Sequence, residues 1–197
     1  IDLNGNSLTG PHTLTAKAYD IFGNVSTSSA VTLIFPATSG VGDYADMTEN
    51  NALGWDWWTQ NNYASTLTND TTLVKEGSYS LKFDTTAAFD TYVKYPKGGG
   101  ANWNLTDRTY FTFWAYAINA NVPQFQGPAV VYLKDDSGNY YRYESVGEVM
   151  NQALNKWNQF VIPLTGDATW IRTTAGTPNF SDIDYLEIHN DTWGVNF

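Results

Sequence analysis

The sequence contains no cysteine, few charged residues and no long apolar run. The lack of cysteine excludes a disulfide framework and thiolate metal sites, although it does not by itself exclude secretion. No apolar run approaches a membrane span and no signal peptide is present, so we expect any signal to lie upstream of Ile1 or to have been removed. The two histidines, His12 and His189, lie too far apart to give the ligand spacing of a zinc-type site.

Basic residues are also scarce, because 10 Lys and Arg stand against 20 Asp and Glu and give a formal net charge of −10. No stretch concentrates Lys and Arg, so the negative electrostatic field of the protein opposes binding to nucleic acid or to an anionic polysaccharide. A neutral ligand is therefore expected, with neither nucleic acid nor a membrane as a partner. Aromatic residues at 16%, with abundant Asn, Thr, Ser and Gly, are typical of extracellular, β-rich bacterial proteins.

Residues 1–36 indicate the end of a domain and not a whole one. Two alternating strands, 12–20 and 26–35, flank a turn at 21–24 in which Gly23 and Asn24 supply positive φ. Two strands cannot bury a core alone. Segments 10–20 and 23–26 resemble the last two strands of bacterial Ig-like modules, which connect the catalytic and binding parts of secreted enzymes. The resemblance implies partner strands upstream of Ile1.

Residues 37–42 have the composition of a linker, and residues 43–197 predict one all-β domain. The strand spacing fits a β-sandwich or jelly roll. Only 146–153 and 181–183 look helical, and neither is long enough to anchor an α/β fold. The expected strands are 44–47, 65–68, 78–84, 92–95, 109–117, 129–135, 140–144, 158–163 and 184–189.

Alternation assigns faces within the best strands. Core positions are expected at Phe111, Phe113, Ala115, Ala117, Ala129, Val131 and Leu133. The opposite positions mix rings with polar groups, as a ligand-facing sheet would, and predict a glycan-binding face that carries Trp114, Tyr116, Tyr132, Arg142 and Glu144. The alternative is that Trp114 and Tyr116 are covered by another loop or strand.

A tryptophan cluster at 54–60 is the second candidate site, with Trp55, Trp57, Trp58 and Gln60 as its members. The C–H-rich face of a sugar ring packs on an indole plane, while amide and carboxylate groups bond its hydroxyls. The alternative is a core role for these rings. Because adjacent tryptophans cannot both point to one face of a strand, at least one should lie on a surface or in a loop. Trp58, beside Thr59 and Gln60, is the preferred stacking residue.

Four segments resemble strands of jelly-roll carbohydrate-binding modules in the order 74–83, 105–114, 156–164 and 183–188. The second contains Tyr110–Trp114, and the third runs from Trp157 to Ile162-Pro163-Leu164. The resemblance implies a non-catalytic module that binds a neutral polysaccharide and targets an attached extracellular glycoside hydrolase to its substrate. Such modules usually finish with a further strand carrying an Asp-Gly pair, and the sequence stops at Phe197 without it. The last strand is therefore expected to be missing or supplied otherwise.

Many modules of this kind hold a structural calcium near the N-terminal strand, and calcium requires six to eight oxygen ligands. The local candidates are Asp43, Asp46, Glu49 and Glu76. The usual ligand from the final strand has no counterpart in the sequence, and solvated surface acids are the alternative interpretation.

Catalysis is not expected in this chain. A glycosidase requires two carboxylates in a cleft, and no pair stands out, although Glu187 alternates with Leu186 and Ile188 and is expected to face a sheet surface. No nucleophile elbow, phosphate loop or HExxH motif is present. A structural or adhesive module of a bacterial surface protein and a small catalytic jelly roll remain the alternative functions.

Overall fold

A computed structural model describes residues 10–29, 31–35, 57–59, 65–75, 77–84, 91–118 and 127–190. The chain divides into two units, Ile1–Asp43 and Tyr44–Phe197. Both are built from antiparallel strands, as expected for an all-β protein. In the described part of the chain, no helix is long and apolar enough to cross a membrane.

The first unit is a β-ribbon. Strand β1 (Gly10–Leu14) pairs with β4 (Val31–Phe35), and β2 (Lys17–Tyr19) pairs with β3 (Val25–Thr27). In the turn, Asp20 Oδ1 accepts hydrogen bonds from the backbone nitrogens of Phe22 at 2.8 Å and Asn24 at 2.9 Å. Side chains from Thr15 to Ser29 are exposed, including Ile21 and Phe22. The hairpin prediction is confirmed, whereas its Ig-like character stays a prediction.

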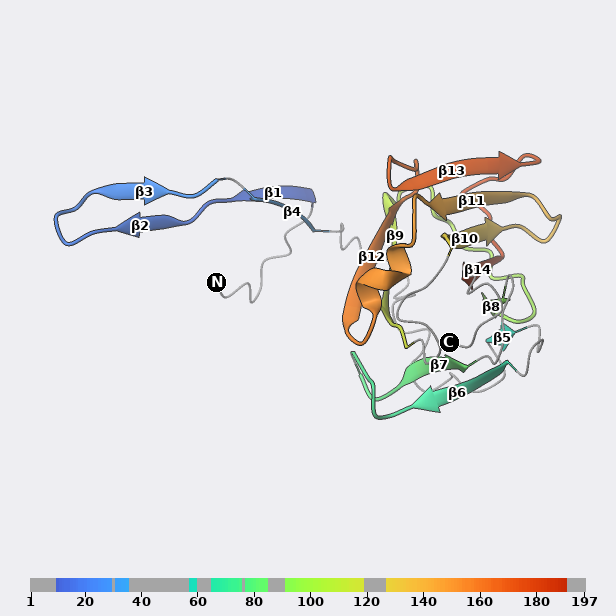
Figure 1. Ribbon diagram of the computed structural model, residues 1–197. Helices are drawn as coiled ribbons and strands as arrows, with labels where there is room; N and C mark the ends of the chain where they lie inside the picture. The colour runs from blue at the N-terminus through green and yellow to red at the C-terminus, as the bar shows by residue number, and fades with distance from the viewer. Residues whose placement is uncertain are drawn as a thin grey trace. The chain divides into compact units, whose positions relative to one another are not determined.

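A six-stranded sheet with the order β13-β11-β10-β14-β8-β5 forms one layer of the second unit (Figure 1). Every neighbouring pair is antiparallel. The strands are β5 (Trp58–Thr59), β8 (Thr91–Tyr95), β10 (Ala129–Lys134), β11 (Tyr140–Ser145), β13 (Trp170–Ala175) and β14 (Tyr185–Asn190). Because β5, β8 and β14 are neighbours here but not in the chain, the sheet brings distant segments together.

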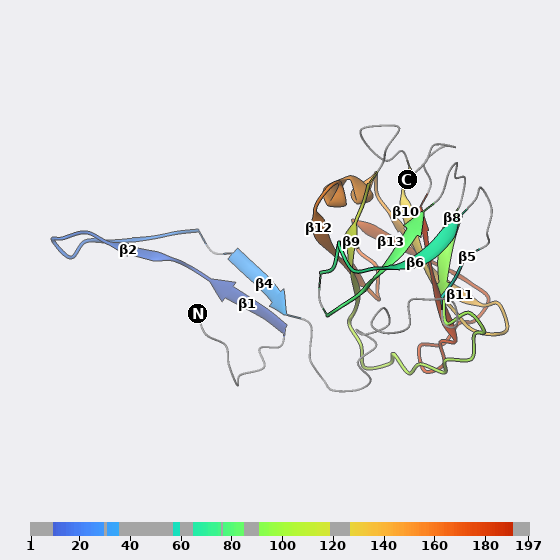
Figure 2. The ribbon, with the colours of Figure 1, turned by 90° about the horizontal axis from the view of Figure 1, so that it is seen from below.

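The second layer contains β9 (Tyr110–Tyr116), which pairs with β12 (Trp157–Pro163). Strands β6 (Thr66–Asp70) and β7 (Ser80–Asp84) form a separate hairpin. It lies below the two layers in Figure 1 and in front of them in Figure 2, which is seen from below. A 3-10 helix, η2 (Val149–Ala153), precedes β12.

The core lies between the two layers, which makes the unit a β-sandwich, as expected from the sequence. Strand β10 contributes Ala129, Val131 and Leu133, each 1% exposed or less. Strand β12 contributes Phe160 and Ile162, and Phe111, Phe113 and Ala115 of β9 pack against them, as alternation predicts. Tyr143 is fully buried, and its hydroxyl donates to the carbonyl oxygen of Leu164 at 2.9 Å. Burial raises the pKa of this phenol, so it remains a donor.

Some elements differ from the sequence prediction. Strands β5 and β13 were not expected, since β5 has two residues and β13 buries only Trp170 outright. The helix expected at 181–183 is wrong, because Ile183 instead exchanges two backbone hydrogen bonds with Trp103. The strand expected at 44–47 lies outside the described residues.

Candidate functional site

The outer face of the six-stranded sheet carries one side chain from each strand in a continuous line, which we call the cross-strand row. In the ladder, Tyr132 stands opposite Arg142 on one side and Glu187 on the other. Directly opposed residues of an antiparallel pair share a face. The row therefore reads Thr173, Arg142, Tyr132, Glu187, Lys94 and Trp58. With strands about 4.8 Å apart, the row extends for roughly 24 Å.

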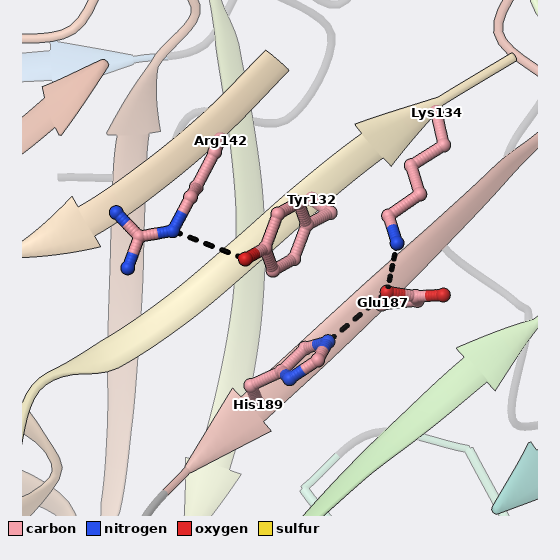
Figure 3. A network of polar contacts seen from close by, with 5 residues as sticks. All are labelled: Tyr132, Lys134, Arg142, Glu187 and His189. Carbon is pink, nitrogen blue, oxygen red and sulfur yellow. Dashed lines mark hydrogen bonds and ion pairs between the residues drawn. The ribbon is translucent and has the colours of Figure 1, made fainter. Parts of the chain in front are cut away.

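A buried carboxylate lies at the centre of this face (Figure 3). Glu187 is only 5% exposed. Its Oε2 forms an ion pair with Lys134 Nζ at 2.7 Å and a hydrogen bond with His189 Nε2 at 3.0 Å. Burial by itself raises the pKa of Glu187, but the hydrogen bonds from His189 and Lys134 outweigh it and lower that pKa overall. Glu187 is therefore ionised and held in a fixed position.

A second polar group lies on the neighbouring strands. Arg142 Nε donates to Tyr132 Oη at 3.1 Å, and the same guanidinium forms an ion pair with Glu144. Burial lowers the pKa of Arg142, but the hydrogen bonds with Glu144 and Tyr132 raise it above its usual value. The guanidinium, which has five donors in a fixed plane, is thus oriented before any ligand arrives.

Stacked rings join these polar groups to Trp58. The His189 ring stacks on Tyr92 with centroids 4.4 Å apart and lies 4.9 Å from the ring of Tyr132. The Trp58 ring lies 5.6 Å from that of Tyr92 at an interplanar angle of 54°. Lys94 Nζ lies 3.8 Å from the centroid of the Tyr185 ring, in cation–π geometry. Aromatic and hydrogen-bonding groups therefore alternate along one face.

Two hollows open on this face, on opposite sides of Tyr132 in the strand order. The Trp58 hollow, of about 320 Å³, is lined by Trp58, Tyr92, Lys94, Lys97 and Glu187. The Arg142 hollow, of about 390 Å³, lies over β11 and β13 and is lined by Pro128, Arg142, Glu144, Ser145, Val146, Gly147, Ile171 and Thr173. Both are shallow, as suits a ligand that lies along a surface and not inside a cavity.

Four sequence-predicted residues, Trp58, Tyr132, Arg142 and Glu144, are brought together on this face. Trp114 and Tyr116 are not. They lie on β9, in the other layer, and both layers turn their inner faces to the same core. The expectation of one face that holds all five residues is therefore wrong, because alternation assigns sides within a strand but not the sheet to which the strand belongs.

The tryptophan cluster is divided in the same way. Trp57 is 6% exposed and packs in the core 4.9 Å from the ring of Tyr95, whereas Trp58 is half-buried on the outer face. A buried indole cannot offer its face to a sugar, so the structure removes Trp57 from the candidate set. Trp55 and Gln60 lie outside the described residues.

The sequence did not assign Tyr92, Lys94, Lys134 and His189 to the site. Glu187 was expected to face a sheet surface but was not included among the binding residues. The signal was present in β14, where Glu187 and His189 alternate with Leu186 and Ile188. What the sequence did not contain was the pairing of β14 with β10 and β8, which places these side chains beside Tyr132.

The calcium candidates Asp43, Asp46, Glu49 and Glu76 lie outside the described residues, so the calcium site stays a prediction. Within the ranges that the structure describes, no group of three or more His, Asp or Glu is arranged to hold a metal ion.

No protein-family model and no curated protein matches the sequence. Among solved structures, the chain is similar to one concerned with the promiscuous specificity of carbohydrate-binding modules of the β-sandwich superfamily. The identity is 16% and the TM-score 0.37, over 95% of this chain and 70% of that one. Because similarity at this level carries no argument about ligand or activity, function must be inferred from the site itself.

Proposed function

We propose that this protein is a non-catalytic glycan-binding module whose ligand lies on the outer face of the six-stranded sheet. The observation that supports this is the cross-strand row, in which the Trp58 ring and the Arg142 guanidinium are separated by Tyr132, Glu187 and Lys94. A sugar offers both an apolar C–H face and a rim of hydroxyls, and this row offers a partner to each. The length of the row suits an oligosaccharide and not a single sugar.

Preorganisation favours binding on this face. The Arg142 guanidinium is held by Tyr132 and Glu144, and the Glu187 carboxylate is held by Lys134 and His189. A ligand would not need to order these side chains on arrival, and ordering is a main cost of weak association. The same contacts make catalysis a less suitable use, because both glutamates are already engaged by cations.

The charge distribution supports a neutral glycan. The protein carries a net charge of −10, and the charged groups at the centre of the face occur as ion pairs, Lys134 with Glu187 and Arg142 with Glu144. Paired charges of this kind bond hydroxyls at close range and create little long-range field. A neutral polysaccharide therefore fits both the whole molecule and its site.

The test is titration calorimetry of the whole chain against neutral β-glucans, mannans, xylans and starch fragments. Saturable heat is expected with one class, weakened by Arg142→Ala and unchanged by Trp114→Ala on the other layer. The absence of heat with every glycan would contradict the proposal, and tight binding to a protein partner would then favour the adhesive alternative. Release of sugar by the isolated chain would favour the catalytic alternative.

The wider setting is also a proposal. The resemblances in the sequence suggest an extracellular bacterial module that targets an attached glycoside hydrolase to its substrate, with an Ig-like domain completed by upstream strands. A catalytic domain in the parent sequence would support this setting, and a parent without one would contradict it. A structural calcium near Asp43 predicts that chelation lowers the melting temperature and leaves glycan affinity intact. An unchanged melting temperature would remove the calcium proposal.

A further inference from the structure

Within the part of the chain that the structure describes, Glu187 is bonded through one of its two oxygens. Lys134 Nζ and His189 Nε2 both meet Oε2, and the other oxygen points away from them (Figure 3). Among the described residues, no hydrogen bond to Oε1 is formed. An ionised carboxylate can accept about four hydrogen bonds. About half of the hydrogen-bonding capacity of Glu187 is therefore unused, although the residue is only 5% exposed.

The unused oxygen is not completely closed off from solvent. The fully buried side-chain atoms that lack a partner belong to Thr59, Asn69 and Asn190, and Glu187 Oε1 is not among them. Glu187 lines the Trp58 hollow together with Tyr92 and Lys94. Oε1 is therefore the oxygen of Glu187 that can accept a hydrogen bond from a ligand in this hollow, beside Trp58.

We propose that Glu187 determines specificity in the Trp58 hollow, where Oε1 accepts a hydrogen bond from a free hydroxyl of a sugar ring packed on Trp58. This inference rests on the proposed function and names the ligand class of the same site: a glycan that is uncharged and carries a free hydroxyl at this position. Lys134 and His189 act as positioning residues, because they hold the carboxylate ionised with one oxygen turned to the hollow.

The buried acceptor discriminates against modified sugars. An O-methyl or O-acetyl group at the same place has no proton to donate and would cover Oε1, which loses its water without a replacement. Leaving a buried charged acceptor unpaired is costly, and sites built around a substrate hydroxyl reject analogues that lack it strongly. A sugar with a hydroxyl at Oε1 is therefore preferred for two reasons. The hydroxyl forms a hydrogen bond, and it avoids the cost of leaving a buried carboxylate oxygen without a donor.

Lys94 and Lys97 also line this hollow and would favour an acidic sugar, so the two charge types compete. Lys97 is exposed, and Lys94 Nζ lies over the Tyr185 ring. Glu187 is the most buried of the three charges. Because charges act more strongly where water is excluded, a carboxylate on the ligand is disfavoured beside Glu187, and the neutral class is preferred.

The substitution Glu187→Gln provides a specific test. Lys134 and His189 are both donors, so the amide oxygen is expected to remain with them and the amide NH₂ to turn to the hollow. The variant exchanges an acceptor for a donor at that place. A hydroxyl and a methyl ether can both accept from an NH₂, so the variant should bind native and methylated sugars alike.

The experiment titrates the whole chain with cellohexaose, laminarihexaose, mannohexaose, xylohexaose and maltohexaose, each native and partly O-methylated, and with an oligogalacturonide. The wild type is expected to bind one native hexaose tenfold to hundredfold more tightly than its methylated form. Glu187→Gln should reduce that ratio to about one, and the control Glu148→Gln, at an exposed glutamate that lines neither hollow, should preserve it. The native-to-methylated ratio of the wild type needs no variant, so a variant that fails to fold does not remove the test.

Three results would overturn the inference and leave the proposed function intact. The first is equal binding of native and methylated hexaose by the wild type, and the second is a ratio that persists in Glu187→Gln. The third is tighter binding of the oligogalacturonide, which would show that Lys94 and Lys97 dominate the hollow. Failure to bind any sugar would instead overturn the proposed function, and this inference with it.

Discussion

The two outer faces of the sandwich both carry aromatic rings, but they differ in what surrounds those rings. On the two-stranded layer, Trp114 is 38% exposed with Lys75 Nζ 4.2 Å from its ring, and Tyr116 meets Trp157 edge-on. On the six-stranded layer, Trp58 lies beside Tyr92, Lys94 and the fixed carboxylate of Glu187. An exposed ring alone is common on protein surfaces. The comparison shows that oriented polar groups beside a ring distinguish a candidate binding face.

The largest effect is expected from the tryptophan that belongs to neither face. Trp57→Ala should lower the free energy of unfolding by about 3–5 kcal/mol, because it empties a core position. Trp58→Ala, one residue later, should cost far less stability. Urea unfolding of both variants tests the division of the cluster, and equal losses would contradict it.

The central ion pair of the six-stranded face gives the next effect. Lys134→Met leaves the buried carboxylate of Glu187 with His189 as its one cationic partner. The free energy of unfolding should fall by about 2–3 kcal/mol. This loss is smaller than for a fully buried pair, because Lys134 keeps some contact with water. Lys94→Met is the matched control, because its ammonium lies over a ring, and it should cost about 0.5–1 kcal/mol. Similar losses in the two variants would mean that the Lys134 pair contributes little.

Glycan affinity should separate the two faces directly. Trp58→Ala is expected to weaken binding by about 1–3 kcal/mol, tenfold to hundredfold, since a sugar covers one face of the indole and association costs offset part of that burial. Trp114→Ala should leave affinity unchanged. The reverse result in calorimetry would move the site to the β9–β12 layer.

Acid should reduce the stability that the polar contacts of the six-stranded face contribute. Since the folded pKa of Glu187 is lowered, its ionised form stabilises the protein above the ordinary value of 4.5, and this contribution is lost as the pH falls below that value through the folded pKa. The groups around it are Lys134, His189, Tyr185 and Lys94. Urea unfolding between neutral and acid pH should show a smaller loss for Glu187→Gln than for the wild type. An equal loss of unfolding free energy in the two proteins would exclude a stabilising role for ionised Glu187.

The smallest effect is expected from salt. Because a neutral ligand releases few counterions, glycan affinity should change little between low and high ionic strength. A steep loss of affinity in calorimetry at high salt would indicate an anionic ligand and would restore importance to Lys94 and Lys97.

Local patterns predicted what depends on local geometry. Alternation identified the inward positions Val131, Leu133 and Phe113, and Gly23 takes the positive φ expected in the hairpin turn. Both follow from the period of a strand and the backbone demands of a turn. The all-β sandwich could be predicted for the same reason, since strand spacing and turn residues repeat along the chain. The positive φ expected at Asn24 is wrong, because Asn24 is held in the turn by hydrogen bonds to Asp20 instead.

Non-local pairing could not be predicted, and most of the site depends on it. Arg142 and Tyr132 come from one hairpin and were placed together correctly. Glu187 reaches Tyr132 only through the pairing of β14 with β10, and Trp58 reaches the face through a two-residue strand on β8. Trp114 was assigned to the wrong surface because its pattern is the same whichever sheet its strand joins.

The cross-strand row takes each member from a different strand, at positions that run in space as 173, 142, 132, 187, 94 and 58. No continuous peptide contains the site, so it cannot be transplanted as a segment, and a linear motif search has nothing to find. Substitution at one position of the row changes the side chain of one strand and leaves the backbone pairing of the other strands as it is. The composition of the row is therefore open to change one strand at a time.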